Sequence, residues 1–400
     1  MKEPKHILVL TYWGMGDALI QTYTLPYLRI MRDLLPEGST IHFLTLEKNG
    51  GDPNERLLEK GIYHFSFPLY RFGFKAAFSW WKNLRKLKRI IREKNISTIH
   101  TWCTSAGAIG WVLSKRTGVP LVLDSYEPHA EAMVETGTWK KGGIAHRVLF
   151  YMERKQTFHA KWLIGVVPAM QEYARVKYGF NGKNFVFKPA CVDLQKFSLE
   201  KRKNPQLMKS LGLEDKTTCV YVGKFGGLYM REQAFDFFRE CFQYWGDKFR
   251  VLLITSTPRE ELDALCAGAG ISPEKVISKF LPPAEVPDYL GLGDFAISAV
   301  KPVPSRKCCT PIKNGEYWAM GIPVVIASGI SEDSAIIANS GTGVVREDFT
   351  AGGLEKTMVQ LEELLKKNKD GSLSVKIRDL AIQHRNYKIA EDAYRKIYTE

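Results

Sequence analysis

Lys313 and Glu316 have residue types and a spacing that suit the binding of a nucleotide sugar. They are three positions apart, so in a helix their side chains project from nearly the same face. A cation in the first turn opposes the helix dipole, and this cost is offset where the helix N-terminus faces an anion such as a diphosphate. The carboxylate one turn later is placed to bind a sugar hydroxyl. An ordinary ion pair on a helix surface is the alternative that these two residues leave open.

The residues around this pair predict a short helix that leads into a buried strand. Thr310 suits the N-cap, Pro311 the first turn and Gly321 the left-handed exit from the helix. Pro323 stops the helix, and the apolar run 324–327 predicts a strand. The lysine is therefore expected in the first helical turn.

Carboxylates and a histidine gather after another expected strand, 120–123. Asp124, Glu127, His129 and Glu131 fall within eight residues at the end of that strand, which is more than a turn needs. His129 is the first candidate for a catalytic group here, with Asp124 and Glu127 next. Helix capping or local hydrogen bonding is the alternative for each of them.

Glycines follow the first expected strand of each half of the chain. Gly14 and Gly16 follow strand 6–11, and Gly223 follows strand 218–222. Neither pattern is the complete dinucleotide-binding fingerprint, which has three glycines and a later acidic residue. These glycines either let the backbone approach a ligand at the carboxyl ends of the strands or form ordinary tight turns.

Strand-like and helix-like segments alternate along the whole chain, which predicts an α/β architecture with parallel sheets. The expected strands are 6–11, 41–46, 98–102, 120–123, 162–166, 218–222, 249–255, 276–280, 295–299 and 324–327. A charged stretch without apolar residues, 200–205, separates two series of strands. We therefore predict two doubly wound domains, 1–195 and 196–380, and a C-terminal helix in 381–400 that packs back on the N-terminal domain.

Positive charge is concentrated in the N-terminal half. The 400 residues carry a net charge of +14, and residues 1–190 hold 28 Lys or Arg against 15 Asp or Glu. Residues 70–95 alone hold nine basic residues against Glu93, with apolar residues at helical spacing and aromatic residues before them. This pattern predicts binding to an anionic membrane surface. A core-packed helix with a solvated basic face is the alternative, and nucleic-acid binding is disfavoured because no nucleic-acid-binding signature accompanies the charge.

Several classes of protein are excluded by what the sequence lacks. No apolar run approaches the roughly 18 residues of a membrane span. The N-terminus passes directly into a strand, so no signal peptide is expected. Seven scattered cysteines without a CxxC pair predict neither a disulfide framework nor a zinc site, and they favour the reducing cytoplasm.

Three segments carry a family resemblance that extends over essentially the whole chain. Residues 311–325 contain Pro-x-Lys-x-x-Glu-Tyr-x-Ala-x-Gly-x-Pro-Val-Val, residues 221–225 read Tyr-Val-Gly-Lys-Phe, and residues 280–290 begin Phe-Leu-Pro-Pro. Together they resemble GT-B fold glycosyltransferases and are most similar to family 4 of the retaining enzymes. The resemblance implies two doubly wound, Rossmann-like domains that face a central cleft.

The resemblance also implies roles for individual residues. Lys313 meets the donor diphosphate, Glu316 bonds the ribose, and Lys224 approaches the same diphosphate. The expected donor-binding residues are Gly14, Gly16, Gly223, Lys224, Arg231, Leu281, Lys313 and Glu316. Asp17 and Gln21 are expected acceptor contacts. Cys308 stands where the family often has the first glutamate of a double-glutamate motif, so the sugar contacts at that position are open.

The expected activity is metal-independent, retaining transfer of a sugar from a nucleotide-diphosphate sugar to a glycan acceptor, without a cofactor. The basic N-terminal half favours a lipid-linked acceptor, as in cell-surface polysaccharide assembly, and a place in the cytoplasm at the inner face of the membrane. One alternative is a nucleotide-sugar epimerase with the same fold. Another is a non-catalytic protein of this fold that binds a nucleotide sugar or RNA.

Overall fold

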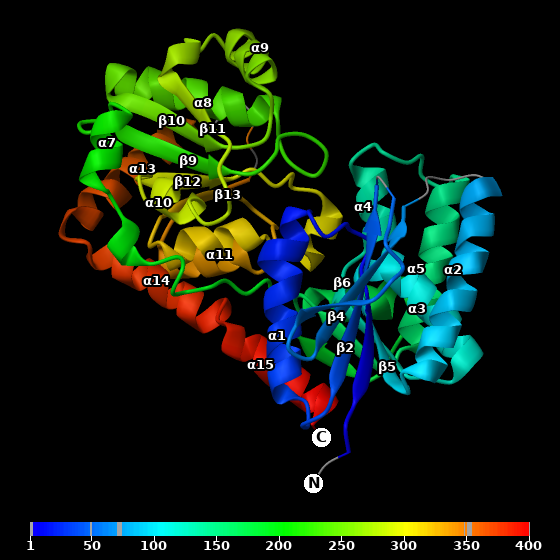
Figure 1. The fold of residues 1–400 in the computed structure, drawn as a ribbon. Coiled ribbons are helices and arrows are strands. Elements are labelled where there is room, and N and C mark those ends of the chain that lie inside the picture. Colours follow the sequence, from blue (N-terminus) through cyan, green and yellow to red (C-terminus); the bar gives the residue numbers. More distant parts are fainter. Residues whose placement is uncertain (1–2, 49, 70–73, 348, 350–353, 400) are drawn as a thin grey trace. The chain divides into compact units, whose positions relative to one another are not determined.

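The computed structural model describes residues 3–48, 50–69, 74–347, 349 and 354–399, and it divides the chain into two compact units (Figure 1). The first unit consists of Met1–Pro189 and Lys388–Glu400, and the second unit is Ala190–Tyr387. The chain thus leaves the first unit six residues before the predicted boundary at 195 and returns at 388 instead of 381. The charged stretch that suggested the boundary lies inside the second unit, where Arg202 and Lys203 donate hydrogen bonds to carbonyls of that unit.

The described part of the first unit contains one mixed sheet in the order β3-β4-β2-β1-β5-β6-β7-β8. All neighbouring strands run parallel except β3 and β4, which are antiparallel. The strands are β1 His6–Leu10, β2 Thr40–Glu47, β3 Arg56–Glu59, β4 Ile62–Pro68, β5 Ile96–Trp102, β6 Leu121–Tyr126, β7 Trp162–Gly165 and β8 Phe185–Phe187. β1 lies where the strand order reverses, and such a position is the usual ligand-binding point of an open α/β sheet.

The helices of the first unit cover both faces of its sheet. They are η1 Ile20–Thr24, α1 Leu25–Leu34, α2 Phe74–Glu93, α3 Cys103–Thr117, α4 His129–Glu135, α5 Ile144–His159, α6 Ala169–Tyr173, η2 Ala174–Tyr178 and α15 Tyr387–Tyr398. The connections through α2, α3 and α5 run opposite to the connection through α1 along the sheet, so right-handed crossovers place them on the other face. Figure 1 shows this arrangement, with α2, α3 and α5 side by side. Tyr394 of α15 contacts Tyr27 of α1, so α15 lies on the α1 face.

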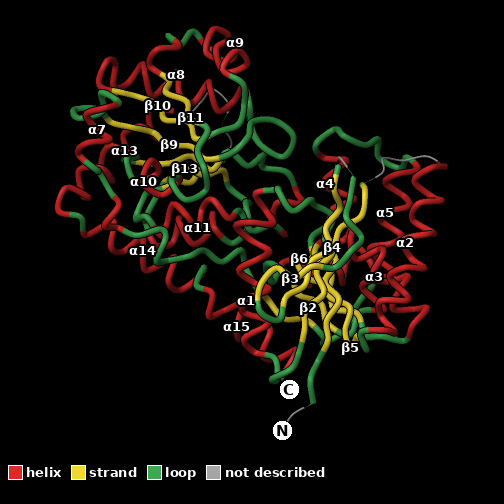
Figure 2. The backbone as a smooth tube through the Cα atoms, viewed as in Figure 1, coloured by secondary structure: helices red, strands yellow, loops and turns green. Residues whose placement is uncertain are grey.

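The second unit is built on a fully parallel sheet among its described residues, in the order β11-β10-β9-β12-β13-β14 (Figure 2). The strands are β9 Thr217–Val222, β10 Phe249–Ile254, β11 Val276–Lys279, β12 Phe295–Ser298, β13 Val324–Ala327 and β14 Val344–Arg346. The helices are η3 Leu199–Lys201, α7 Pro205–Ser210, α8 Glu232–Trp245, η4 Gly246–Lys248, α9 Arg259–Ala269, η5 Pro273–Lys275, α10 Val286–Leu290, η6 Pro304–Cys308, α11 Ile312–Ala319, α12 Asp333–Ser340, α13 Leu354–Lys367, η7 Asn368–Asp370 and α14 Ser372–His384. The order reverses at β9, so the carboxyl end of β9 is the expected binding point of this unit.

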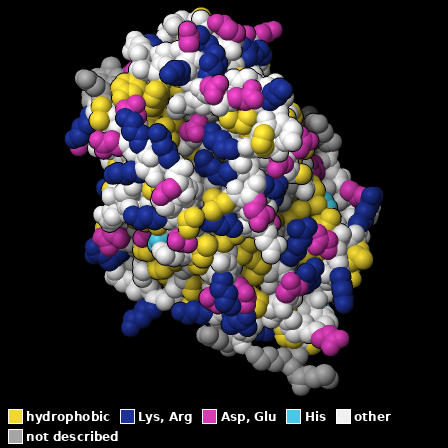
Figure 3. Space-filling view, turned by 90° about the vertical axis from the view of Figure 1, so that its left-hand side faces the viewer, with side chains coloured by type: hydrophobic (Ala, Val, Ile, Leu, Met, Phe, Trp, Pro, Cys, Tyr) yellow, Lys and Arg dark blue, Asp and Glu magenta, His cyan; other side chains and the backbone are white. Residues whose placement is uncertain are grey.

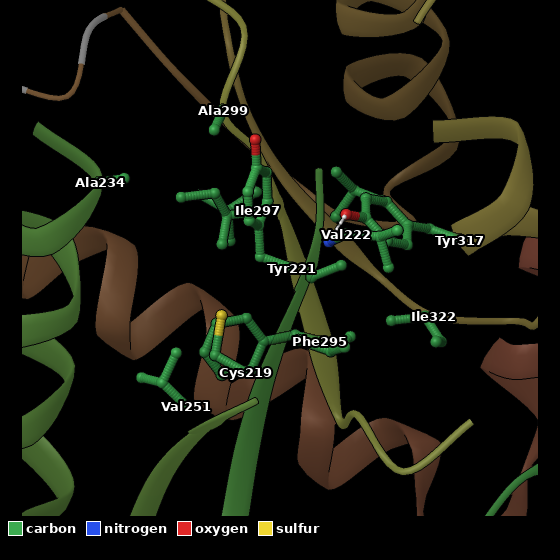
Figure 4. Close-up of a cluster of buried hydrophobic side chains, with 14 of the residues drawn as sticks. Cys219, Tyr221, Val222, Ala234, Val251, Phe295, Ile297, Ala299, Tyr317 and Ile322 are labelled. Carbon is green, nitrogen blue, oxygen red and sulfur yellow. Dashed lines mark hydrogen bonds between the residues drawn. The ribbon is translucent and has the colours of Figure 1, made fainter. Parts of the chain in front are cut away.

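The core of the second unit explains why its strands β9 to β13 could be predicted from the sequence. Val251 and Phe295 are fully buried, and Figure 4 shows them packed around Cys219 between sheet and helices. A parallel sheet covered on both faces needs strands that are apolar throughout. The α/β prediction with parallel sheets is confirmed.

The surface carries mixed charge (Figure 3), and the helices are not of the membrane-spanning kind among the described residues. On the face drawn in Figure 3, basic and acidic side chains are interspersed with hydrophobic ones. Across the described segments, no helix has both the length and the apolar character that a membrane span requires.

Candidate functional site

The predicted pair Lys313 and Glu316 lies on α11, and the two side chains are in contact. Lys313 Nζ is 3.0 Å from Glu316 Oε2, so the ion pair that the sequence left open as an alternative is present. Glu316 is buried and Lys313 is half-buried, so this is no solvated surface pair. A buried carboxylate is costly unless cations and donors surround it, and such an environment is typical of a binding site.

A second lysine, Lys196, also lies near Glu316. Burial lowers the pKa of Lys196, and the negative charges of Glu316 and Asp193 partly restore it. Glu316 thus interacts electrostatically with Lys196 as well as with Lys313. The sequence did not indicate Lys196, because it belongs to an irregular segment without a motif.

A buried polar cluster holds the start of α11. Arg385 forms an ion pair with Asp333, and Asn314 Nδ2 donates to the same carboxylate at 2.8 Å. The hydroxyl of Thr310 accepts from Arg385 Nη1 at 2.8 Å and from the Ala190 N–H at 3.2 Å. The prediction that Thr310 caps the helix is therefore wrong, because its oxygen is already engaged by these two donors. α11 begins at Ile312 with Pro311 as the cap residue, one position later than predicted.

The glycine turn after β9 is attached to α11. The Val222 N–H donates to the Tyr317 hydroxyl at 3.0 Å, an interaction drawn in Figure 4. Gly223 has φ +146°, which disfavours other residues, and the Tyr221 hydroxyl donates to the Lys224 carbonyl at 2.6 Å. Lys224 itself is exposed. The structure thus brings the predicted Gly223–Lys224 turn and the helix of Lys313 together at the carboxyl end of β9.

Two other predicted donor residues have partners of their own. Arg231 lies before α8 and its Nη2 is 2.9 Å from Glu261 Oε1 on α9. Leu281 follows β11 and packs, half-buried, against the core of the unit. Neither contact places these residues beside Lys313.

The segment that precedes α11 contains a buried arginine that the sequence did not single out. Cys308, the position left open in the sequence analysis, is buried at the end of η6. Two positions earlier, the guanidinium of Arg306 is also buried, and its Nε and Nη2 donate to the Ser305 hydroxyl at 3.3 and 3.0 Å. In the described residues, no three His, Cys, Asp or Glu side chains are grouped closely enough to hold a metal ion.

In the first unit, the predicted residue Asp124 lies inside a buried polar cluster. Its carboxylate oxygens lie 3.1 Å from Lys188 Nζ and 3.2 Å from His100 Nε2, and one accepts from the Tyr394 hydroxyl at 2.7 Å. Burial alone would raise the pKa of Asp124, but Lys188 and His100 hold it at about 2. Asp124 is fully buried among these partners, and its catalytic role stays a prediction.

His129 and Glu127 remain candidates, since both are partly exposed. His129 is the first residue of α4, and the Ala130 N–H behind it donates to Glu153 Oε1 at 2.9 Å. Burial raises the pKa of Glu153 to about 7. Glu153 of α5 therefore positions the helix that carries His129. The sequence missed this role because the partners are 23 residues apart.

The glycine turn after β1 is held by Glu47 at the end of β2. The Met15 N–H donates to Glu47 Oε1 at 2.8 Å, and a Cβ at Gly14 would lie 2.5 Å from Glu47 Oε2. Gly16 is exposed. Asp17 Oδ1 accepts from the Leu19 N–H at 2.9 Å, and Gln21 Nε2 donates to the Met15 carbonyl at 2.8 Å. Both predicted acceptor contacts are thus exposed and make local bonds that shape this turn.

Comparison with known proteins agrees with the fold and identifies a match for the first unit. Residues 21–190 match the model of the glycosyl transferase 4-like domain. Over this range the chain resembles that family. The matched range takes in Asp124, Glu127 and His129 and ends at the boundary between the two units.

Solved structures share the fold of the whole chain at low identity. Sucrose-phosphate synthase from Thermosynechococcus elongatus is 14% identical with a TM-score of 0.75, over 99% of this chain and 98% of that one. HepE from Anabaena in complex with UDP-glucose is 13% identical with a TM-score of 0.70, over 98% and 99%. A glycosyltransferase from Rickettsia africae is 15% identical with a TM-score of 0.67, over 100% and 98%. No curated protein sequence matches. The match to the glycosyl transferase 4-like domain and these neighbours confirm the predicted resemblance to GT-B glycosyltransferases.

Proposed function

We propose that the chain transfers a sugar from a nucleotide-diphosphate sugar to a glycan acceptor. The observation that carries the proposal is the group at the carboxyl end of β9, where buried Glu316 lies 3.0 Å from Lys313, with the charge of Lys196 near it, on a helix bonded to the Gly223 turn. Cations beside a helix N-terminus suit a diphosphate, and a fixed carboxylate suits a ribose hydroxyl.

The chemistry follows from these charges. Departure of the nucleotide diphosphate builds negative charge, and Lys313, Lys224 and Arg231 would stabilise it without a metal ion. The backbone near Leu281 would contact the base. In the first unit, His129 and Glu127 would act near the reacting sugar, and Asp17 and Gln21 would contact the acceptor. We propose retention of the anomeric configuration on the resemblance alone.

The structural neighbours support a nucleotide-sugar donor. HepE was solved with UDP and with UDP-glucose, and an Escherichia coli protein of the trehalose-6-phosphate type was solved with UDP-2-fluoro glucose. At identities of 9–13% these ligands belong to those proteins, and they make a UDP-sugar the first donor to test here.

The acceptor part of the proposal rests on charge. We propose a lipid-linked acceptor at the inner face of the membrane, in cell-surface glycan assembly, because the first unit is strongly basic. On α2 the exposed side chains include Lys82, Arg85 and Arg89. Residues 70–73, with Arg71 and Phe72, lie outside the described residues.

Thermal unfolding with UDP-, GDP- and CMP-sugars tests the donor site. Ligand at about 100 times its Kd stabilises by about 2.7 kcal/mol, which raises Tm by several degrees. We expect one class of donor to do so, and Lys313→Ala or Glu316→Ala to abolish the shift. Lys388→Ala and Glu391→Ala are the matched controls, because these residues form an exposed ion pair of the same types and spacing. If no nucleotide sugar or nucleotide diphosphate shifts the wild type, the proposal fails.

A further inference from the structure

The helix α5 carries its hydrophobic side chains on the outside. Ile144 is 84% exposed, Val148 and Tyr151 are 52% exposed, and Phe158 is 53% exposed. We call these four residues the α5 stripe. Spacings of four, three and seven place them on one line of the helix. At 1.5 Å per residue the stripe is about 21 Å long.

The buried face of α5 is polar, and each of its polar residues has a partner. Glu153 accepts from the Ala130 N–H at 2.9 Å, and Gln156 Nε2 donates to the Thr104 carbonyl at 2.9 Å. The Thr157 hydroxyl bonds the Tyr126 hydroxyl. These bonds fix the rotation of the helix, because turning the stripe inward would leave buried polar groups unpaired. Exposure of the stripe is therefore built into the fold.

The charged side chains around the stripe are basic. α5 is described over its whole length, and its exposed charged residues are Arg147, Arg154 and Lys155, while its one acidic residue, Glu153, is buried. The flanking segments add exposed Lys140, Lys141 and Lys161. Lys155 Nζ lies 5.3 Å from the Tyr151 ring, and the Arg154 guanidinium lies 5.6 Å from the Phe158 ring.

We propose that the α5 stripe docks on an anionic lipid surface. Aliphatic and aromatic side chains on one line, with cations along one flank, within the line and beyond both ends of the helix, match the acyl boundary and the headgroups of such a surface. A second copy of this chain fits poorly, because two stripes face to face would bring their cations together. The proposal sharpens the membrane part of the proposed function and moves the contact from α2 to α5. It does not depend on the donor site.

Vesicle flotation tests the proposal with the full chain. We expect binding to phosphatidylcholine vesicles that contain phosphatidylglycerol and much weaker binding to phosphatidylcholine alone. The variant Ile144→Ser/Val148→Ser/Tyr151→Ser should lower the partition coefficient at least about tenfold, since each buried aliphatic side chain contributes about that factor or more. Arg147→Gln/Arg154→Gln/Lys155→Gln should lower binding to the anionic vesicles about fivefold for each cation that meets the surface.

The matched control removes exposed hydrophobic side chains elsewhere. Val359→Ser/Val375→Ser/Ile382→Ser changes three exposed apolar residues of the second unit, and it should float like the wild type. The proposal is overturned if the wild type binds no anionic vesicle, or if the stripe variant floats unchanged. A wild-type dimer that the stripe variant converts to a monomer in gel filtration would overturn it in favour of self-association. The thermal shift with nucleotide sugar should persist in the stripe variant, which separates failure of this proposal from failure of the donor site.

Discussion

Two helices on the same face of the first sheet, α2 and α5, use their hydrophobic side chains in opposite ways. α2 buries Leu87 and Ile91 and exposes cations such as Arg89. α5 buries polar side chains and exposes hydrophobic ones, Ile144 most of all. Both segments mix basic and hydrophobic residues in sequence, and the sequence pointed to α2 as the membrane-binding helix. Over residues 82–93, whose side chains the structure describes, α2 is a core-packed helix with a basic outer face.

Periodicity in the sequence locates a hydrophobic line on a helix, but it does not show whether that line faces the sheet or the solvent. On α2, Leu87 and Ile91 of the hydrophobic line are buried. On α5 the inward face is set by specific hydrogen bonds, among them the bond from Glu153 to the start of α4. Those partners are remote in sequence, so the orientation of α5 could not be read from α5 itself.

The largest effect should separate the two helices by stability. Leu87→Ala on α2 removes a fully buried side chain, and we expect the free energy of unfolding to fall by about 2–5 kcal/mol. Ile144→Ala on α5 removes an exposed side chain and should change it by no more than about 0.5 kcal/mol. Urea titrations of both variants measure the difference. Equal losses would contradict the opposite orientations of the two helices.

A medium effect concerns the polar inner face of α5. Glu153→Ala leaves the Ala130 N–H and the Tyr178 hydroxyl without their acceptor, so we expect a loss of about 1–3 kcal/mol in the free energy of unfolding. The variant Glu153→Gln keeps an acceptor oxygen at this position and should lose less. A Glu153→Ala variant as stable as the wild type would show that this bond does not set the rotation of α5.

The same residue predicts a pH dependence of stability. The pKa of Glu153 is raised by burial to about 7 in the folded chain, against an ordinary value of 4.5. The folded state therefore holds this proton more tightly, and the contribution of Glu153 to stability decreases as the pH rises from 4.5 to about 7. The stability of Glu153→Gln relative to wild type should rise across this window. Urea titrations at several pH values test it, and a constant difference would contradict the burial of a protonated carboxyl.

The smallest effect is expected from the basic face of α2. Lys86→Gln/Lys88→Gln/Arg89→Gln should lower flotation with anionic vesicles less than the stripe variant does, because these cations meet the surface without an inserted side chain beside them. Salt should weaken their contribution further. A loss as large as that of the stripe variant would make α2 an equal part of the contact.

Local pattern was enough for β9 to β13 of the second unit and for most of α11. The runs around Val220 and Val325 are apolar without interruption, and Gly321, at φ +65°, ends the helix as expected. β3, β4, β8 and β14 were missed. β8 and β14 are three residues long, and β4 interleaves apolar residues with His64 and Ser66, which bond neighbouring strands and loops.

The candidate site likewise has features that local sequence predicted and features that depend on residues distant in the sequence. Lys313, Glu316 and the Gly223 turn could be predicted because their spacing is local. Lys196 could not, since only the folded chain brings it near Glu316. The burial of Asp124 also depends on distant groups, above all Lys188 and Tyr394.

The contact between Asp124 and Tyr394 has a consequence for biosynthesis. The two residues are 270 positions apart, and the Tyr398 hydroxyl likewise reaches His100 at 2.7 Å. During translation, Asp124 and His100 lack these two hydroxyl partners until the second unit has been synthesised. The unit that is translated first therefore gains these two buried hydrogen bonds only after the second unit has been translated.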